Sequence, residues 1–320
     1  MSDGKWMSGM TSDTPAVVAA QAVLTARFEV VRHYLPLAVG EPYKDREHVH
    51  QLRVGTRRAA AALKGFAPLL PKKRFGIVKR HLRMIRQAAG DARDWDVFLE
   101  DLPTSRPLAT PTGKPALDFL LGYALAGRST AQARLVAIAA DIGSEFSELS
   151  SSLAAHVQEP DRGSALGTFG DLAQSYLIEL FTQFGSEVEA VLGSSDDVTQ
   201  LHRLRIRAKR LRYAIEIVAE CFAPPLRSDL YPALEEIQAT LGAWRDATIR
   251  MGRLEGIREQ AQAVTPGDWV RLRPGLTGLI RSLRAKRTAA QQKFGPLRLT
   301  WANLTTAHPL EALRLTPQLA

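Results

Sequence analysis

Apolar residues recur at helical spacing along most of the chain, and no stretch shows the strict alternation typical of a half-buried strand. Between residues 15 and 39, for example, Val23, Leu24 and Phe28 belong to such a pattern. Helices are predicted over 15–39, 44–70, 71–89, a shorter stretch after Asp94, 114–142, 169–192, 197–222, 226–241, 244–263 and 268–293. The sequence therefore predicts an all-α protein.

Glycines, prolines and acidic residues punctuate this pattern. Gly90 is predicted to end the third helix, and four prolines between 103 and 115 mark a loop. The Ser-, Gly- and Ala-rich stretch 143–168 is interpreted as the connection between two halves, and GSSDD at 193–197 as a turn with N-cap residues. The tail from Gly295 has no predicted role.

One nine-residue segment occurs twice. HQLRVGTRR at 50–58 returns as HRLRIRAKR at 202–210, an offset of 152 residues. The same offset places GDARD, which ends at Asp94, on GAWRD, which ends at Asp246. Because the register holds without insertion or deletion over this distance, we expect two copies of one helical unit, at about 15–142 and about 164–294.

The charge of the chain is concentrated in the first copy of this unit. The formal net charge is +9, and residues 44–94 alone carry 14 Lys or Arg against 4 Asp or Glu. Such a concentration indicates a polyanionic partner: nucleic acid, an anionic membrane or a phosphate polymer. A single cysteine, Cys221, and an N-terminus unlike a signal peptide predict a cytoplasmic protein, and the most apolar run is too short to span a membrane.

Helical wheels place the cations on narrow stripes, at 100° per residue. Leu52, Ala59 and Leu63 fall on the opposite, core-facing side of the second helix. Like charges at this spacing destabilise a helix unless an anion neutralises them, although most charged faces are simply solvated. The three stripes are His50, Arg53, Arg57 and Lys64; His202, Arg205, Lys209 and Arg212; and Lys72, Lys79, Arg83 and Arg86.

The repeated pattern His-x-x-Arg-x-x-x-[Arg/Lys]-[Arg/Lys], followed by Gly-x-x-Arg-Asp, closely resembles the CHAD family, the conserved-histidine α-helical domain. The resemblance covers about residues 15–295 and leaves 296–320 as a tail. It implies one compact domain of two four-helix repeats, with a basic central cleft that binds inorganic polyphosphate, and in some members recruitment to polyphosphate granules. The matching positions are His50, Arg53, Arg57, Arg58, Arg93, His202, Arg205, Lys209, Arg210 and Arg245.

The two copies are not equivalent. At the offset of 152, Lys64, Lys79, Arg83 and Arg86 become Glu216, Tyr231, Glu235 and Gln238, so we expect an asymmetric cleft whose first-half wall attracts the polymer more strongly. The acidic E-x-E-x-K signature of the CYTH triphosphate enzymes, which often accompany CHAD domains, does not precede the domain.

Several roles remain open at this stage. The two motif histidines can donate to phosphate, fix helix packing or, less in keeping with their Arg-rich surroundings, ligate a metal. Asp94 and Asp246 are interpreted as helix caps, whereas Arg93 and Arg245 can pair with a carboxylate or reach the cleft.

Three functional classes follow from the basic stripes. An RNA or single-stranded DNA binder would interleave aromatic residues with the cations, and an enzyme of polyphosphate metabolism would cluster carboxylates around a metal. The stripes contain neither feature. We therefore expect a non-enzymatic polyphosphate-binding protein without cofactor, with nucleic-acid binding as the alternative.

Overall fold

The structure is a computed structural model of the whole chain, and it describes residues 4–41, 45–158, 167–191, 198–264 and 266–314. These residues form eight α-helices and no sheet, which confirms the predicted all-α class. The helices are α1 (Ala16–Gly40), α2 (Glu47–Gly65), α3 (Lys72–Asp101), α4 (Lys114–Ala155), α5 (Phe169–Ala190), α6 (Val198–Val218), α7 (Tyr231–Val264) and α8 (Pro266–Ala307). A 3₁₀ turn at Ala67–Leu69 lies between α2 and α3, a 3₁₀ turn at Ala219–Cys221 and a π turn at Leu226–Leu230 lie between α6 and α7, and a 3₁₀ turn at Leu310–Leu313 follows α8.

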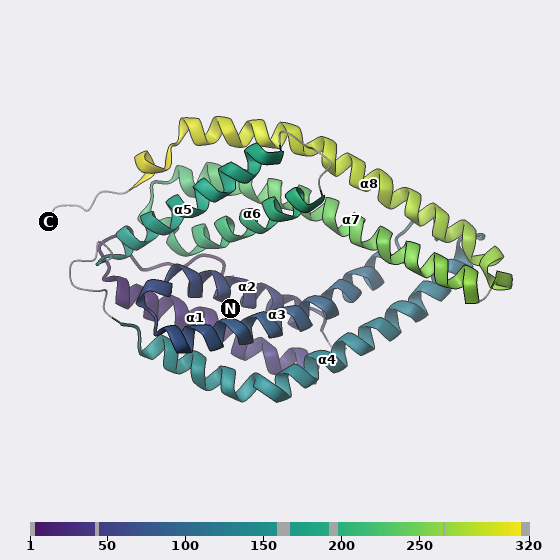
Figure 1. Cartoon of the computed structure of the whole chain (residues 1–320), viewed down its shortest axis with the longest axis horizontal. Coiled ribbons are helices and arrows are strands. Elements are labelled where there is room, and N and C mark those ends of the chain that lie inside the picture. Colours follow the sequence, from purple (N-terminus) through teal and green to yellow (C-terminus); the bar gives the residue numbers. More distant parts are fainter. Residues whose placement is uncertain (1–3, 42–44, 159–166, 192–197, 265, 315–320) are drawn as a thin grey trace.

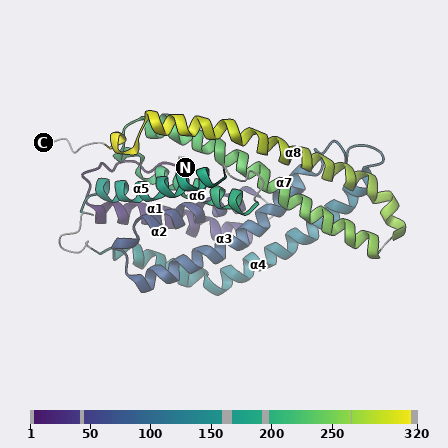
Figure 2. The ribbon, with the colours of Figure 1, turned by 45° about the horizontal axis from the view of Figure 1, so that its top comes forward.

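The repeat offset extends well beyond the motif that revealed it. Adding 152 to the bounds of α4 gives the bounds of α8, and adding it to the turn Ala67–Leu69 gives the turn Ala219–Cys221. Figure 1 shows the consequence: α1–α4 form one half of the molecule and α5–α8 the other, with α2 and α6 in contact where the halves meet. The long pairs α3/α4 and α7/α8 extend together to the far end (Figure 2).

Two predicted helix ends are wrong. α3 continues through Gly90, and α7 continues through Gly242, each without interruption. Neither glycine has the positive φ of a helix C-terminal cap, since Gly9 alone has a positive φ among the described residues. The buried alanines beside Gly90 keep its helical face on the core. Asp94 and Asp246 consequently lie inside helices and do not cap them.

Two longer segments are also more helical than the pattern predicted. α4 runs to Ala155, because Phe146, Leu149 and Leu153 continue its core-facing stripe through the Ser-rich stretch. α8 runs through Pro296 to Ala307, where Trp301 is buried and its ring stacks on Phe181 at 5.8 Å. The predicted turn at 193–197 lies outside the described residues.

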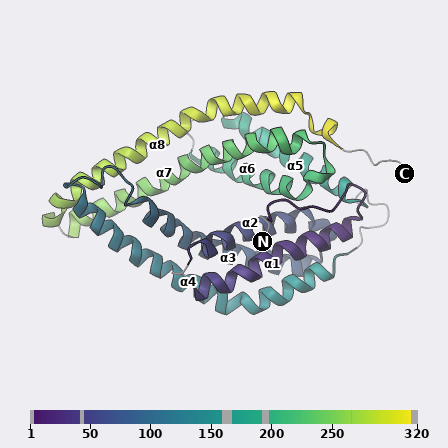
Figure 3. The same cartoon turned by 180° about the vertical axis from the view of Figure 1, so that it is seen from behind.

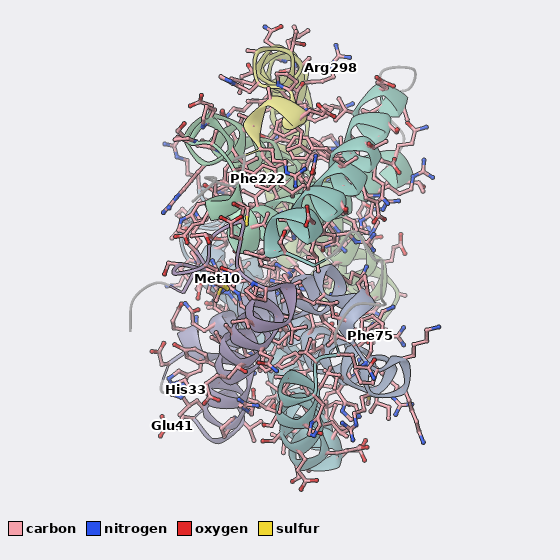
Figure 4. All side chains as sticks on the ribbon, turned by 90° about the vertical axis from the view of Figure 1, so that its left-hand side faces the viewer. Met10, His33, Glu41, Phe75, Phe222 and Arg298 are labelled. Atoms are coloured by element: carbon pink, nitrogen blue, oxygen red, sulfur yellow. The ribbon has the colours of Figure 1, made fainter. Side chains whose placement is uncertain are left out.

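Two apolar clusters hold the helices together. The larger contains residues of all eight helices, and Met10 of the N-terminal segment packs into it at the level where the halves meet (Figure 4). The smaller lies where α3 and α4 meet α7 and α8, and includes Phe98, Leu254 and Leu276. The molecule is thus closed at both ends of its long axis, and a polar region remains between the two clusters.

Candidate functional site

A cavity of about 660 Å³ opens where the two halves meet. Side chains of five helices line it: α2, α3, α5, α6 and α7. Ten of the lining residues are Lys or Arg, and two are carboxylates, Asp91 and Asp94. The ten cations are Arg53, Arg57, Lys64, Lys79, Arg83, Arg86, Arg205, Lys209, Arg210 and Arg245.

A second cavity of about 230 Å³ adjoins the first, between α3 and α7. The two cavities share Asp94 and four cations, Arg53, Arg57, Arg205 and Lys209, which we call the central cluster. The second cavity adds two cations that the sequence patterns did not single out, Arg250 and Arg253. The central cluster therefore stands where the two cavities join.

The amphipathic pattern of α2 and α6 produces this arrangement. Leu52, Ala59 and Leu63 of α2 are fully buried, as predicted. Leu204, Ala208 and Leu211 of α6 are fully buried as well. Because the two helices contact each other across the seam, the basic stripes beside these core faces meet in one space. The structure thereby brings together two stripes that are about 150 residues apart in the sequence.

Burial and mutual repulsion destabilise the charges of the central cluster. Burial, followed by the neighbouring Arg57, Arg205 and Arg53, lowers the pKa of Lys209 from 10.5 to about 6. Burial and Arg245 lower the pKa of Arg205 to about 10. Shifts in this direction mean that burial and the neighbouring arginines outweigh the nearby carboxylate of Asp246.

The cations that α2 and α3 contribute to the larger cavity are destabilised in the same way. Burial and the nearby Arg57 lower the pKa of Arg86, and burial and the nearby Arg210 lower that of Lys64.

Asp94 is the one carboxylate among the described residues within ion-pair distance of the central cluster, with an oxygen 3.2 Å from Arg53. The cavity therefore presents a large excess of positive charge to any ligand that enters it.

The two motif histidines are placed differently. His202 lines the larger cavity, and burial together with Arg245 and Arg205 lowers its pKa. His50 lies on α2 outside both cavities; burial lowers its pKa, and Glu47 opposes the shift. Both imidazoles are therefore neutral at pH 7 and have one N–H each to donate.

Four further predicted cations also lie outside the two cavities. Arg58 binds Glu216 at 2.8 Å and Arg212 binds Glu235 at 3.0 Å, within a partly buried network. Arg93 binds Glu100 at 3.1 Å, and Lys72 is exposed at the first residue of α3. In contrast, Arg53, Arg57, Lys64, Lys79, Arg83, Arg86, His202, Arg205, Lys209, Arg210 and Arg245 all line the larger cavity.

Sequence reasoning missed Arg250 and Arg253. Both follow Asp246 at helical spacing on α7, so a wheel started at Asp246 would have found them. Arg250 is paired with Asp101, and the guanidinium of Arg253 lies 3.8 Å from the ring centre of Trp95. The aromatic contact of Arg253 has no signal in the sequence, because Trp95 belongs to the other half.

The residues that the structure describes include no group of three or more His, Cys, Asp or Glu able to hold a metal ion. No described helix is both long and apolar enough to cross a membrane. The charged side chains that line the larger cavity are mainly guanidinium and ammonium groups, which suit phosphate and other oxyanions.

Comparison with known proteins decides the family. Residues 22–255 match the family model described as CHAD domain. The chain belongs to the CHAD family. This confirms the resemblance seen in the repeated His-x-x-Arg motif, and the matched range includes both copies of it.

Two solved structures share the CHAD fold of this chain. The crystal structure of the CHAD domain from the plant Ricinus communis is 22% identical, with a TM-score of 0.69, and the match covers 96% of this chain and 95% of that one. PptA from Streptomyces chartreusis is 17% identical, with a TM-score of 0.66 and coverage of 89% and 99%. A search of curated proteins returned no match.

Proposed function

We propose that this CHAD protein binds inorganic polyphosphate in the larger cavity, and that it acts as a binding protein without a catalytic step of its own. The observation that carries the proposal is the excess of ten Lys and Arg side chains over two carboxylates in one cavity. A flexible chain of phosphates supplies many closely spaced negative charges, which are what this cavity lacks. The family is generally associated with this ligand, which supports the choice.

The aromatic residues of the larger cavity favour polyphosphate over RNA. Its two tyrosines offer little surface for a base to stack on: Tyr213 is 5% exposed, and the hydroxyl of Tyr176 donates to the carbonyl of Ala61 at 3.3 Å. Stacking contributes about 1–3 kcal/mol per base in single-strand binders. A polymer without bases loses nothing by the lack of such a surface.

The binding residues follow from their positions. The central cluster would hold phosphates where the two cavities join. The basic residues of α3 in the larger cavity, Lys79, Arg83 and Arg86, would hold the adjoining part of the polymer. His202 would donate one hydrogen bond from a neutral ring. Attachment to polyphosphate granules would follow if a free end of the polymer remains outside.

A fourfold substitution tests the proposal. Replacing the central cluster with alanine should abolish binding of long-chain polyphosphate, measured by calorimetry at physiological salt. Helicity should be unchanged, because the four side chains line the cavities and lie outside the two apolar clusters. The matched control replaces four exposed arginines of α8 outside both cavities, Arg271, Arg273, Arg281 and Arg284, and should bind nearly as the wild type does.

Two results would contradict the assignment. Undiminished binding by the fourfold cavity variant would remove the cavity as the site. A preference for RNA over polyphosphate, in a competition at equal phosphate concentration, would favour nucleic acid as the ligand. Binding should also weaken steeply with salt, by analogy with single strands, where log K falls by about 0.7 per neutralised phosphate for each decade of salt.

A further inference from the structure

A third cavity, of about 280 Å³, lies beside the smaller apolar cluster, where the α3–α4 loop meets α7 and α8. We propose that it is an accessory phosphate subsite, which binds the part of a long polymer that extends beyond the two cavities described above. Its lining includes three cations, Arg106, Arg250 and Lys286, and three hydroxyl side chains, Thr104, Ser105 and Ser282.

Arg250 connects this subsite with the site already described. It lines both the second cavity and the third. The one carboxylate in the lining, Asp101, is paired with Arg250. A polymer that leaves the central cluster past Arg250 therefore meets two more cations, Arg106 and Lys286, in the next cavity.

These two cations are available to a ligand. Arg106 and Lys286 are both exposed, and neither has an ion-pair partner among the residues that the structure describes. Cations without a protein counter-ion remain able to form charge-assisted hydrogen bonds with a phosphate. The neighbouring hydroxyl groups of Ser105 and Ser282 can donate to phosphate oxygens, as hydroxyl groups do in many phosphate sites.

The loop that carries Arg106 is held in place by its own contacts. Leu102 and Leu108 are buried in the smaller apolar cluster on either side of Arg106. The hydroxyl of Thr110 donates to the carbonyl of Pro107 and accepts from the amide of Gly113, and that of Thr104 donates to the carbonyl of Asp101. Arg106 is thus presented by an anchored loop.

This loop is a feature of the first half alone. At the offset of 152, residues 102–112 correspond to 254–264, which in the second half continue helix α7. Three prolines in this range, Pro103, Pro107 and Pro111, disfavour the same continuation in the first half. The chain therefore departs from its own repeat at the point where it forms the third cavity.

The proposal rests on the proposed polyphosphate binding and adds a dependence on chain length. A short chain, such as tripolyphosphate, is held by the larger cavity, where the cations are most numerous. Only a long chain can occupy the larger cavity and the accessory subsite together. Loss of the subsite should therefore weaken the binding of long chains and spare short ones.

The experiment compares two double variants of equal charge. Arg106→Gln with Lys286→Gln removes both cations of the subsite. Arg281→Gln with Arg284→Gln is the matched control, because these arginines are exposed on α8 at least about 140° around the helix from Lys286. Binding of long-chain polyphosphate and of tripolyphosphate is measured for each variant as a function of salt.

The expected result is selective for long chains. Two lost contacts should lower the salt slope for long-chain polyphosphate by about 1.4 and the affinity by about 25-fold at 0.1 M salt, on a single-strand slope of about 0.7 per contact. Tripolyphosphate binding, and both ligands with the control variant, should change little. An affinity loss equal to that of the control, or an equal loss for both chain lengths, overturns the subsite; failure of the wild type to bind either ligand overturns the proposed function instead.

Discussion

Lys209 links the proposed binding to pH. Its pKa is lowered from 10.5 to about 6 in the empty cavity, chiefly by burial and then by Arg57, Arg205 and Arg53, whereas Asp246 opposes the shift. About nine in ten of these amines are consequently neutral at pH 7. A bound polyanion places negative charge beside the amine and raises its pKa again, so binding should take up a proton.

The size of the effect follows from the pKa. Protonating an amine of pKa about 6 at pH 7 costs about 1.4 kcal/mol, a small cost beside its new phosphate contact. Binding at pH 7 should therefore take up about 0.9 proton at Lys209. As the pH rises from about 6 toward the higher pKa of the complex, affinity should fall by up to about tenfold per unit, and below about pH 6 this dependence should disappear.

Calorimetry in buffers of different ionisation enthalpy measures this uptake directly. The slope of the observed binding enthalpy against the buffer ionisation enthalpy gives the number of protons, about 0.9 for Lys209 at pH 7. Lys209→Met should lose this contribution. His202→Gln is the control, because the lowered pKa of His202 could also rise in the complex, and this variant should retain the uptake by Lys209.

Two results would refute the reasoning about Lys209. Equal proton uptake by the wild type and by Lys209→Met would place the titrating group elsewhere. A wild-type affinity that does not change between about pH 6 and pH 9 would mean that the amine is already charged in the empty cavity, and hence that burial does not control it.

Two further predictions concern carboxylates. Glu216→Gln leaves the guanidinium of Arg58 buried without its carboxylate and should lower the free energy of unfolding by about 3–5 kcal/mol in urea denaturation. The control Glu236→Gln removes a carboxylate from an exposed ion pair and should lower it by less than about 1 kcal/mol. Similar losses in both variants would contradict the structural role of Glu216. Asp94→Asn frees Arg53 from its ion pair and should raise polyphosphate affinity by up to about fivefold in a binding titration, so a weaker complex would count against the cavity.

The sequence was sufficient for the helices and for most of the basic wall. Apolar periodicity and the offset of 152 identify faces of helices, and faces are what bring Arg53 and Arg205 together in the structure. A wheel does not identify partners, however. Arg57 and Arg58 are adjacent in the motif, but Arg57 lines the cavity and Arg58 binds Glu216, because the two side chains point about 100° apart around α2.

The helix ends show a second limit of the sequence. Gly90 has the residue type of a cap without its backbone conformation, because the buried alanines around it favour continuation of α3. The contacts of Arg250 with Asp101 and of Arg253 with Trp95 depend on packing between the halves, which a local pattern does not contain. Tertiary packing therefore decided the features that the periodicity left unspecified.

The asymmetry of the two halves explains why one face of the α2–α6 seam is open. On the face that α3 and α5 share (Figure 1), Lys64, Lys79 and Arg83 line the larger cavity. The residues at the equivalent positions, Glu216, Tyr231 and Glu235, line neither cavity. They contact Arg58 and the N-terminal segment, which crosses the opposite face of the molecule (Figure 3).

On that second face, carboxylates of the protein itself neutralise the cations, and the N-terminal segment lies over the seam. Glu216 binds Arg58, Glu235 binds Lys5 at 3.1 Å, and the N-terminal segment crosses the face with Trp6 packed on Tyr231 at 4.7 Å (Figure 3). Glu216 thereby joins α6 to α2 of the other half, and Glu235 joins α7 to the N-terminal segment, by partly buried ion pairs. Because the halves are held together on one side by these pairs, the cations on the other side can remain unneutralised without separating them, and an external polyanion is what the open face lacks.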